Sequence, residues 1–429
     1  MAVGNEPKRG EIEPLTAWLA KIIDDIAGKD DGKPLTFGDL RHAKIPSGLE
    51  GVMAGMEHRS IDLRAVTTCV TFGRPMELPF QDTHFFAFDP EDWQRFFPAK
   101  VIHYLMEEGE KIQAPALRRD GKLPFPVGDA MPVVVAARMS LSFPLLFTMI
   151  PLYAVNYHDP AEPLEKVWFS DGGITSNLPI HRFDALFPRW PTLAVNLQYI
   201  PKKGKPGRRR IDESLIYMIR RRADGTRDLW NIFHRGDSPL KDLVGFGGAI
   251  FESAKSWHDN AYLRLPSYRD RVAEIWLRDD EGGMNLNMPA DTIQRLTERG
   301  NAAGIKLRDR FAATPPSESL SWDGHRWARL RSALAGLAAY LHEFRQSVDH
   351  SMPEDRQLAD LLASRKAPSC YEFQSGEQYE AAKAGIEALL DWIAELEAKA
   401  VCDGPGEAAE RPFCDGPRPS VEIGSRAPM

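Results

Sequence analysis

The chain has 429 residues, of which 43% are hydrophobic, and it carries a net charge of -7 at neutral pH. This length and apolar content are enough for a full hydrophobic core and a second packed unit. The acidic balance argues against a general nucleic-acid-binding protein, because neutralising phosphates requires an excess of Lys and Arg over one face. No nucleic-acid partner is therefore expected.

The cysteine pattern and the start of the chain indicate a cytoplasmic protein. The four cysteines lie far apart, with no Cys-x-x-Cys pair, so neither a zinc site nor a dense disulfide framework is indicated. The first residues lack the apolar core of a signal peptide, so export by that route is not expected.

The first elements in the chain are a helix and two strands. Apolar residues recur at helical spacing over 12–26, which predicts a helix that ends at Gly28. Residues 63–71 are rich in β-branched side chains and predict a strand, and 84–88 predicts a second extended segment. The two strands have the pattern of a β-hairpin with a long loop.

Helix signals follow. Asp89 and Pro90 are typical of a helix start, and the predicted helix runs through Phe97 until Pro98 breaks or kinks it. The apolar run 131–136 leads into a further helix near Arg138.

The apolar stretch 141–155 is too short to cross a bilayer and contains two prolines. We expect it to pack in the core, with the wall of a substrate channel as the alternative. Strands are predicted at 166–170 and, as a buried strand, at 192–198. Because strands alternate with helices, the expected fold class is α/β rather than a β-sandwich.

The character of the chain changes after residue 200, where helical patterns dominate from about 240 to 400. The Pro-, Gly- and charge-rich tail is expected to be disordered. The predicted parts are an N-terminal helix (1–33), an α/β part (34–200), a basic loop with a mainly helical region (201–403) and the tail (404–429).

Between 202 and 210 lies a flexible basic loop that could attract anionic phospholipid head groups and place the protein peripherally on a membrane. A nucleic-acid site and a solvated loop balanced by surrounding acids are the alternatives for this patch. Its charged residues are Lys202, Lys203, Lys205, Arg208, Arg209 and Arg210.

Asp171 is the main candidate for chemistry, because it ends a predicted strand and is followed by Gly172 and Gly173. A serine hydroxyl needs a base within hydrogen-bond reach, and a carboxylate at the tip of such a strand can serve as that base. We expect the two glycines to supply positive φ angles for the turn. The alternative is an aspartate that only closes the turn through its own side-chain hydrogen bonds.

The run from 167 to 180 resembles the Asp-Gly-Gly motif of patatin-like acyl hydrolases, in particular the larger bacterial patatin-like phospholipases. Four further segments resemble that family in the same order, namely 34–40, 67–75, 78–80 and 136–144. The resemblance therefore covers roughly 34–199. It implies a layered sheet with helices and a serine–aspartate dyad.

By that resemblance, Asp171 is the base of the dyad, and Gly172 and Gly173 shape the turn. Asn177 and Pro179 fix the loop that follows. Ordinary turn and helix-start residues remain the alternative for each of these positions.

The serine half of the family's motif set does not occur in these 429 residues. The family's nucleophile lies in Gly-x-Ser-x-Gly at a strand-to-helix elbow, after a glycine-rich oxyanion loop. Ser170 and Ser238 each have a glycine on only one side at that spacing, and the first 33 residues contain no run of glycines.

We therefore expect an incomplete patatin-like sheet, either truncated or encoded separately from its serine-bearing half, and a chain that is inactive alone. The alternative is a non-catalytic regulatory or stress-response protein that uses a degenerate patatin-type scaffold to bind a protein or lipid.

Other nucleophile and metal arrangements are weaker. His181 is the nearest histidine to Asp171 and is expected to pack or to lie on the surface. Ser140 or Ser142 as a recruited nucleophile is a minor alternative. No His-x-x-x-His spacing occurs among His84, His103, His158 and His181, so neither a metal nor another cofactor is expected.

Overall fold

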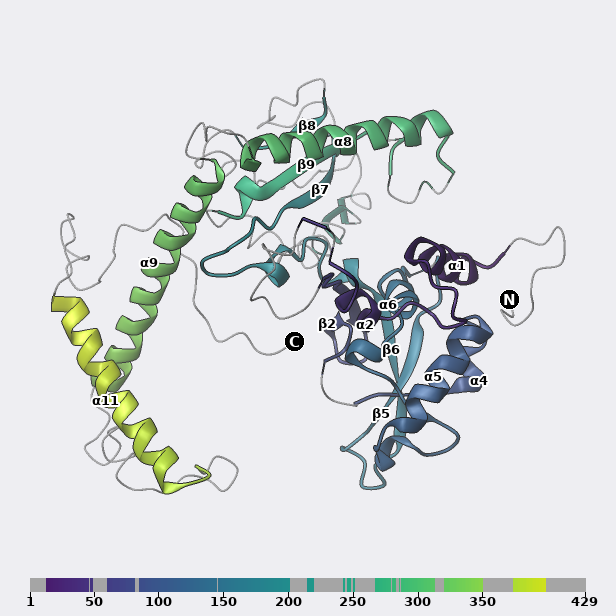
Figure 1. Cartoon of the computed structure of the whole chain (residues 1–429), viewed down its shortest axis with the longest axis horizontal. Helices are drawn as coiled ribbons and strands as arrows, with labels where there is room; N and C mark the ends of the chain where they lie inside the picture. Colours follow the sequence, from purple (N-terminus) through teal and green to yellow (C-terminus); the bar gives the residue numbers. More distant parts are fainter. Residues whose placement is uncertain are drawn as a thin grey trace. The chain divides into compact units, whose positions relative to one another are not determined.

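Two sheets and a set of helices make up the computed structural model, whose chain is traced in Figure 1. It describes residues 13–398 with gaps, so the tail and the basic loop at 202–210 lie outside the described residues. The longer gaps are 49–59, 201–213, 220–241, 251–266 and 350–372, and the shorter ones are 46, 82–84, 145, 244, 248–249, 279, 283–284, 286 and 313–319. The chain divides into two units, whose main segments are Met1–Pro179 for the first and Ile180–Ala249 with Asp259–Ala427 for the second.

The first unit is built on a six-stranded sheet in the order β2-β1-β6-β5-β3-β4, in which every neighbouring pair is antiparallel. Its strands are β1 (Ala65–Cys69), β2 (Arg74–Leu78), β3 (Ala87–Phe88), β4 (Leu123–Pro124), β5 (Ile150–Val155) and β6 (Leu164–Asp171). Its helices are α1 (Leu15–Ala27), α2 (Phe37–Arg41), α4 (Pro90–Trp93), α5 (Ala99–Lys111) and α6 (Val133–Ser140). The predicted α/β class is confirmed.

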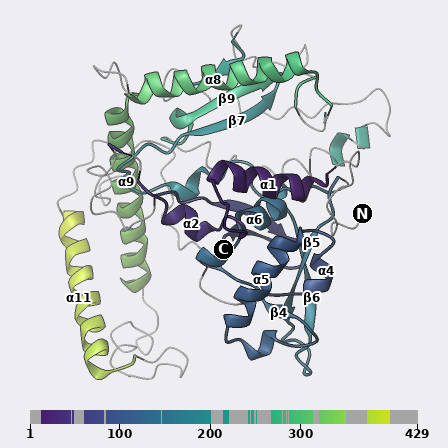
Figure 2. The same ribbon diagram turned by 45° about the vertical axis from the view of Figure 1, so that its right-hand side comes forward.

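Helix α6 packs against β1 and β6, and α1 packs on α6, so the strand that ends at Asp171 is covered by two layers of helix (Figures 1 and 2). Phe169 of β6 is fully buried, with ring centroids 5.7 Å from Phe80 and 5.3 Å from Phe86. This aromatic cluster packs the end of strand β6 into the core.

Several predicted elements of this unit are confirmed. Helix α1 ends at Gly28, which takes φ 65° and donates its N–H back to the helix. Asp89 accepts hydrogen bonds from two backbone N–H groups at the start of α4. The expected core packing of 141–155 holds for strand β5, which is buried along its whole length, but not for Leu141, Phe143 and Leu146 before it, which are exposed.

Two details of this unit differ from the predictions. Strand β1 forms a hairpin with β2 rather than with the segment at 84–88, because the connection 70–73, with Gly73 at φ 64°, closes a tight turn. Helix α4 ends at Trp93 instead of running through Phe97. A residue before proline avoids the helical region, and a new helix, α5, begins only after Pro98.

The second unit contains a three-stranded sheet in the order β7-β9-β8, made of β7 (Ala194–Tyr199), β8 (Ile216–Tyr217) and β9 (Val272–Leu277). Helix α8 (Ala290–Ala312) lies along β9, as Figure 2 shows. Helices α9 (Trp322–Asp349) and α11 (Gly376–Ala398) complete the mainly helical C-terminal region that was predicted.

Strand β9 interrupts the region predicted as mainly helical, and the prediction that the strand near 192–198 is buried is wrong. Val195, Leu197 and Tyr199 of β7 are each at least half exposed. They lie on the same face as the β9 residues under α8, but β7 is an edge strand and α8 covers β9 and β8. One helix is too narrow to cover the third strand.

Candidate functional site

Asp171 is the last residue of β6 and the N-cap of a short 3-10 turn, Gly172–Ile174. Its side chain is half-buried, and its Oδ1 accepts a hydrogen bond of 2.6 Å from the backbone N–H of Gly173. The carboxylate therefore does close its own turn, as the alternative interpretation expected. That bond uses one oxygen and is compatible with a chemical role, because a carboxylate has about four lone-pair positions.

The backbone of Asp171 is held on both sides. Its N–H donates to the carbonyl of Ser142 at 3.1 Å, and its carbonyl accepts a bond of 2.7 Å from the hydroxyl of Thr68. In the strand register it lies opposite Thr67, whose hydroxyl is bonded to the neighbouring Ser170 carbonyl. These contacts with β1 and with the segment after α6 fix where the carboxylate emerges.

Gly172 is needed for close approach rather than for backbone freedom. A Cβ at this position would lie 2.1 Å from the carbonyl oxygen of Val66, a distance that no methyl group can occupy. Neither Gly172 nor Gly173 has a positive φ, so the expectation of positive φ angles in this turn is wrong. Gly172 is there because the turn is pressed against β1.

Gly173 and Asn177 stand beside the carboxylate. A Cβ at Gly173 would lie 2.7 Å from Oδ1 of Asp171 and 2.7 Å from Oδ1 of Asn177. The two side chains thus meet around the bare Cα of Gly173. Asn177 is exposed, and the exposed Pro179 follows the buried Leu178 in the loop that leaves the turn.

These observations can be set beside known proteins. The patatin-like phospholipase family model matches residues 9–184, a range that runs from before α1 to past Asp171 and its turn. We refer to residues 9–184, which match this family model, as the patatin-like domain. The match begins earlier than the resemblance at 34 and takes in α1, and the predicted family is confirmed.

A curated relative extends beyond the patatin-like domain. It is an "RpoH suppressor" from Rhizobium meliloti (strain 1021), 30% identical over 436 residues. The alignment covers 90% of this chain but only 64% of that relative, so the chain spans less than two thirds of the relative's length. No solved structure matches the chain.

Two serines lie at the end of α6, Ser140 as its last residue and Ser142 two residues later. Their surroundings differ. Ser142 is fully buried, donates to the carbonyl of Arg138 at 2.7 Å and accepts from its guanidinium at 2.6 Å. Its hydroxyl therefore has a structural role, because both of these hydrogen bonds are made to Arg138. Ser140 is half-buried at the end of α6, and its Oγ lies 3.4 Å from the point where a Cβ on Gly172 would stand.

Arg138 is a supporting residue that the sequence interpretation missed, although its spacing of four from Ser142 is a signal for contact at a helix end. It donates to Ser142 and, at 2.9 Å, to the carbonyl of Thr148, and burial lowers the pKa of its guanidinium. Because the carbonyl of Ser142 in turn accepts from Asp171, Arg138 braces the segment that holds the catalytic candidate.

Replacing Arg138 with alanine should lower the free energy of unfolding by about 1 to 3 kcal/mol, because the buried hydroxyl of Ser142 and the part-buried carbonyl of Thr148 lose their donor. Urea denaturation of the two proteins measures the loss. Arg119→Ala is the matched control, since Arg119 is exposed and donates to one carbonyl, at Glu162. The control should change by less than about 0.5 kcal/mol. Equal losses for the two variants would contradict the bracing role.

His181 is buried in the 3-10 turn Ile180–Phe183, which belongs to the second unit. Among the described residues no cluster of three or more His, Cys, Asp or Glu side chains has a metal-binding arrangement. Within the same part of the chain, no helix combines the length and the apolar character that a membrane span requires.

Proposed function

We propose that the patatin-like domain carries the aspartate half of a lipid acyl hydrolase site, with Asp171 as the base. The observation that carries this proposal is the placement of Asp171 at the end of β6, with its backbone bonded on both sides and its carboxylate half-exposed beside a glycine turn. A carboxylate held there can take the proton of a serine hydroxyl, whose oxygen then attacks the ester carbonyl. The ester C–O bond breaks, the alcohol leaves with the proton that the carboxyl group returns, and an acyl-enzyme remains.

The nucleophile is the second part of the proposal. No Gly-x-Ser-x-Gly occurs in the 429 residues, and Ser142 is buried with its hydroxyl engaged. We infer that a serine-bearing segment outside these 429 residues supplies the nucleophile and the oxyanion donors. Without them the chain should be a very poor esterase, because one oxyanion donor alone is worth about 100- to 1000-fold in rate.

The test uses the purified chain, a fluorophosphonate probe and a chromogenic short-chain ester. The chain alone should neither react with the probe nor hydrolyse the ester. Co-expression with a neighbouring reading frame that encodes Gly-x-Ser-x-Gly should restore hydrolysis. In that pair, Asp171→Asn should reduce the rate by about 100- to 10,000-fold, the range of general base catalysis.

The matched control is Asp25→Asn, an exposed aspartate on α1 of the same domain, which should leave the restored rate unchanged. Restored hydrolysis that survives Asp171→Asn removes this residue from the mechanism. Covalent labelling of the chain by itself, mapped by mass spectrometry, would show that it already holds a nucleophile, with the accessible Ser140 as the first position to inspect.

A second candidate function is regulatory, and the observation that favours it is the name of the relative, "RpoH suppressor". In this alternative the patatin-like scaffold binds a protein or lipid without turnover. The same variant separates the two proposals: a cell that lacks this protein should be complemented equally by the native chain and by Asp171→Asn if the role is regulatory. It should not be complemented by the variant if hydrolysis is required.

A further inference from the structure

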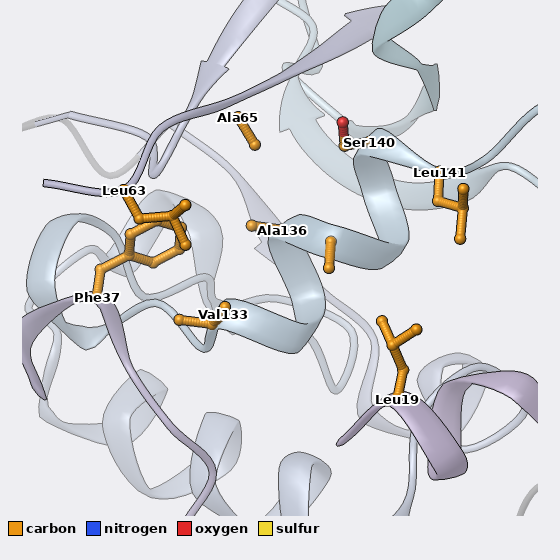
Figure 3. A pocket seen from close by; sticks show the side chains of 9 residues that line it. Leu19, Phe37, Leu63, Ala65, Val133, Ala136, Ser140 and Leu141 are labelled. Carbon is orange, nitrogen blue, oxygen red and sulfur yellow. The ribbon is translucent and has the colours of Figure 1, made fainter. Parts of the chain in front are cut away.

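An apolar pocket of about 360 Å³ opens in the patatin-like domain between α1, α6 and the start of β1 (Figure 3). This volume falls within the range of about 300 to 1,000 Å³ that small-molecule pockets occupy. The residues that line it carry no charge, and one of them is polar. They are Leu19, Phe37, Leu63, Ala65, Val133, Ala136, Ala137, Ser140 and Leu141.

The pocket has buried residues at its base and is open to solvent at its mouth. Phe37, Val133 and Ala136 are buried and form the floor. Leu63 and Leu141 line the same space, yet each is more than a third exposed, so a ligand can enter between them. An uncharged apolar space of this kind favours hydrocarbon over water, because a buried water needs polar partners.

Two paths along the chain lead from the pocket to the Asp171 turn. On β1, Leu63 and Ala65 line the pocket, and Thr67, the next residue on the same face, lies opposite Asp171 in the sheet. On α6, Ser140 supplies the polar atom of the lining and lies next to Gly172 of the turn. The polar end of the pocket is thus the end nearest to the candidate base.

The wall that α1 contributes is fixed to the domain. Asp24, on the same helix as Leu19, is buried and accepts hydrogen bonds of 2.8 Å from the backbone N–H of Leu35 and 2.8 Å from the ammonium group of Lys100. These bonds tie α1 to the chain before α2 and to α5. The pocket is therefore bounded by anchored elements.

We propose that this pocket binds one straight alkyl chain of a lipid, with the polar end of the lipid at the Ser140 hydroxyl. The assignment of that chain as the acyl group of a substrate rests on the function proposed above, whereas the binding itself does not. An alkyl chain suits the lining, which is apolar except for Ser140, and a charged group finds no oppositely charged partner among the lining residues.

The experiment measures binding of saturated monoacylglycerols of increasing chain length to the full chain, by calorimetry below their critical micelle concentrations. Each added methylene should strengthen binding by about threefold to fourfold until the pocket is full, and then by no more. Ser140→Ala should weaken binding by about two- to tenfold through loss of one hydrogen bond. Binding that is independent of chain length would overturn the proposal.

Ala137→Phe should abolish binding by filling the pocket from the α6 side. Ala116→Phe is the control, because Ala116 is exposed on the 3-10 turn Pro115–Leu117 and does not line the pocket. If Ala137→Phe fails to fold, Leu141→Asp at the mouth tests the same point with an exposed residue. A folded Ala137→Phe or Leu141→Asp protein that binds like the native chain contradicts the pocket assignment.

The outcomes also separate this inference from the proposed function. Chain-length-dependent binding, lost in the pocket variants, supports the pocket even if no partner ever restores hydrolysis. Hydrolysis that depends on Asp171 but is unaffected by filling the pocket supports the proposed function and overturns the pocket as its acyl site.

Discussion

Gly172→Ala should destabilise the patatin-like domain by about 3 kcal/mol or more. The added methyl group would lie 2.1 Å from the carbonyl oxygen and 2.8 Å from the carbonyl carbon of Val66. Both are backbone atoms of β1, which is paired with β2 on one side and β6 on the other and cannot move without breaking a ladder. Overpacking usually costs about 1 to 3 kcal/mol, and a clash with a fixed backbone belongs at or above the top of that range.

Two other glycines give the comparison. Gly173→Ala meets the ends of two side chains, Asp171 and Asn177, which can rotate, so it should cost less stability while displacing the candidate base. Gly300 lies on α8, and a Cβ there would have open space around it. Gly300→Ala should therefore stabilise the helix by about 0.5 to 1 kcal/mol.

Hydrogen exchange of β1 and β6, together with urea denaturation, measures the ranking. A Gly172→Ala protein as stable as the native chain, or less affected than Gly173→Ala, would show that the turn does not approach Val66 as described.

The sequence predicts the elements whose patterns are local. The apolar spacing of α1, the Asp-Pro start of α4 and the β-branched run of β1 each depend on neighbouring residues, and the structure contains all three. The hairpin partner of β1 was missed, because the choice between two following segments depends on the turn at Gly73 and on strand order. Neither is visible in hydrophobic periodicity.

The same division holds at the candidate site. A motif of consecutive residues was enough to single out Asp171, Gly172 and Gly173. The steric reason for glycine at position 172 was not predictable, because Val66 comes about a hundred residues earlier and approaches Gly172 only through sheet pairing. The pocket beside Ser140 is likewise formed by residues of α1, α6 and the start of β1, so no single segment of the sequence indicates it.

Strand β9 was missed for another reason. Val272–Leu277 is a short apolar run that periodicity cannot tell from part of a buried helix, and it lies among long helices. In the structure it is the central strand of its sheet, paired with β7 and β8. Tertiary pairing, rather than local preference, decides its conformation.

Asp184 lies in a buried cluster of charged side chains in the second unit. Its side chain is 2% exposed and lies 3.2 Å from the guanidinium of Arg271 and 2.9 Å from that of Arg329. The ring of Tyr268 faces both guanidinium groups, at 4.8 Å and 5.2 Å. Burial, together with the Asp184 carboxylate beside it, raises the pKa of Tyr268 to about 12. Asp184 is thus the carboxylate that pairs with both arginines, while the buried Asp270 also attracts Arg271.

Asp184→Asn should therefore cost the second unit about 3 to 5 kcal/mol, because it leaves two buried positive charges without the carboxylate that offsets them. The control is Asp291→Asn on α8, whose carboxylate is 71% exposed and pairs with Arg295; it should cost less than about 1 kcal/mol. Hydrogen exchange should show lost protection in β9 and α9 for Asp184→Asn, with β6 of the patatin-like domain protected as in the native chain. Equal, small effects of the two substitutions would mean that water reaches the Asp184 cluster, since only solvent could then replace the missing carboxylate.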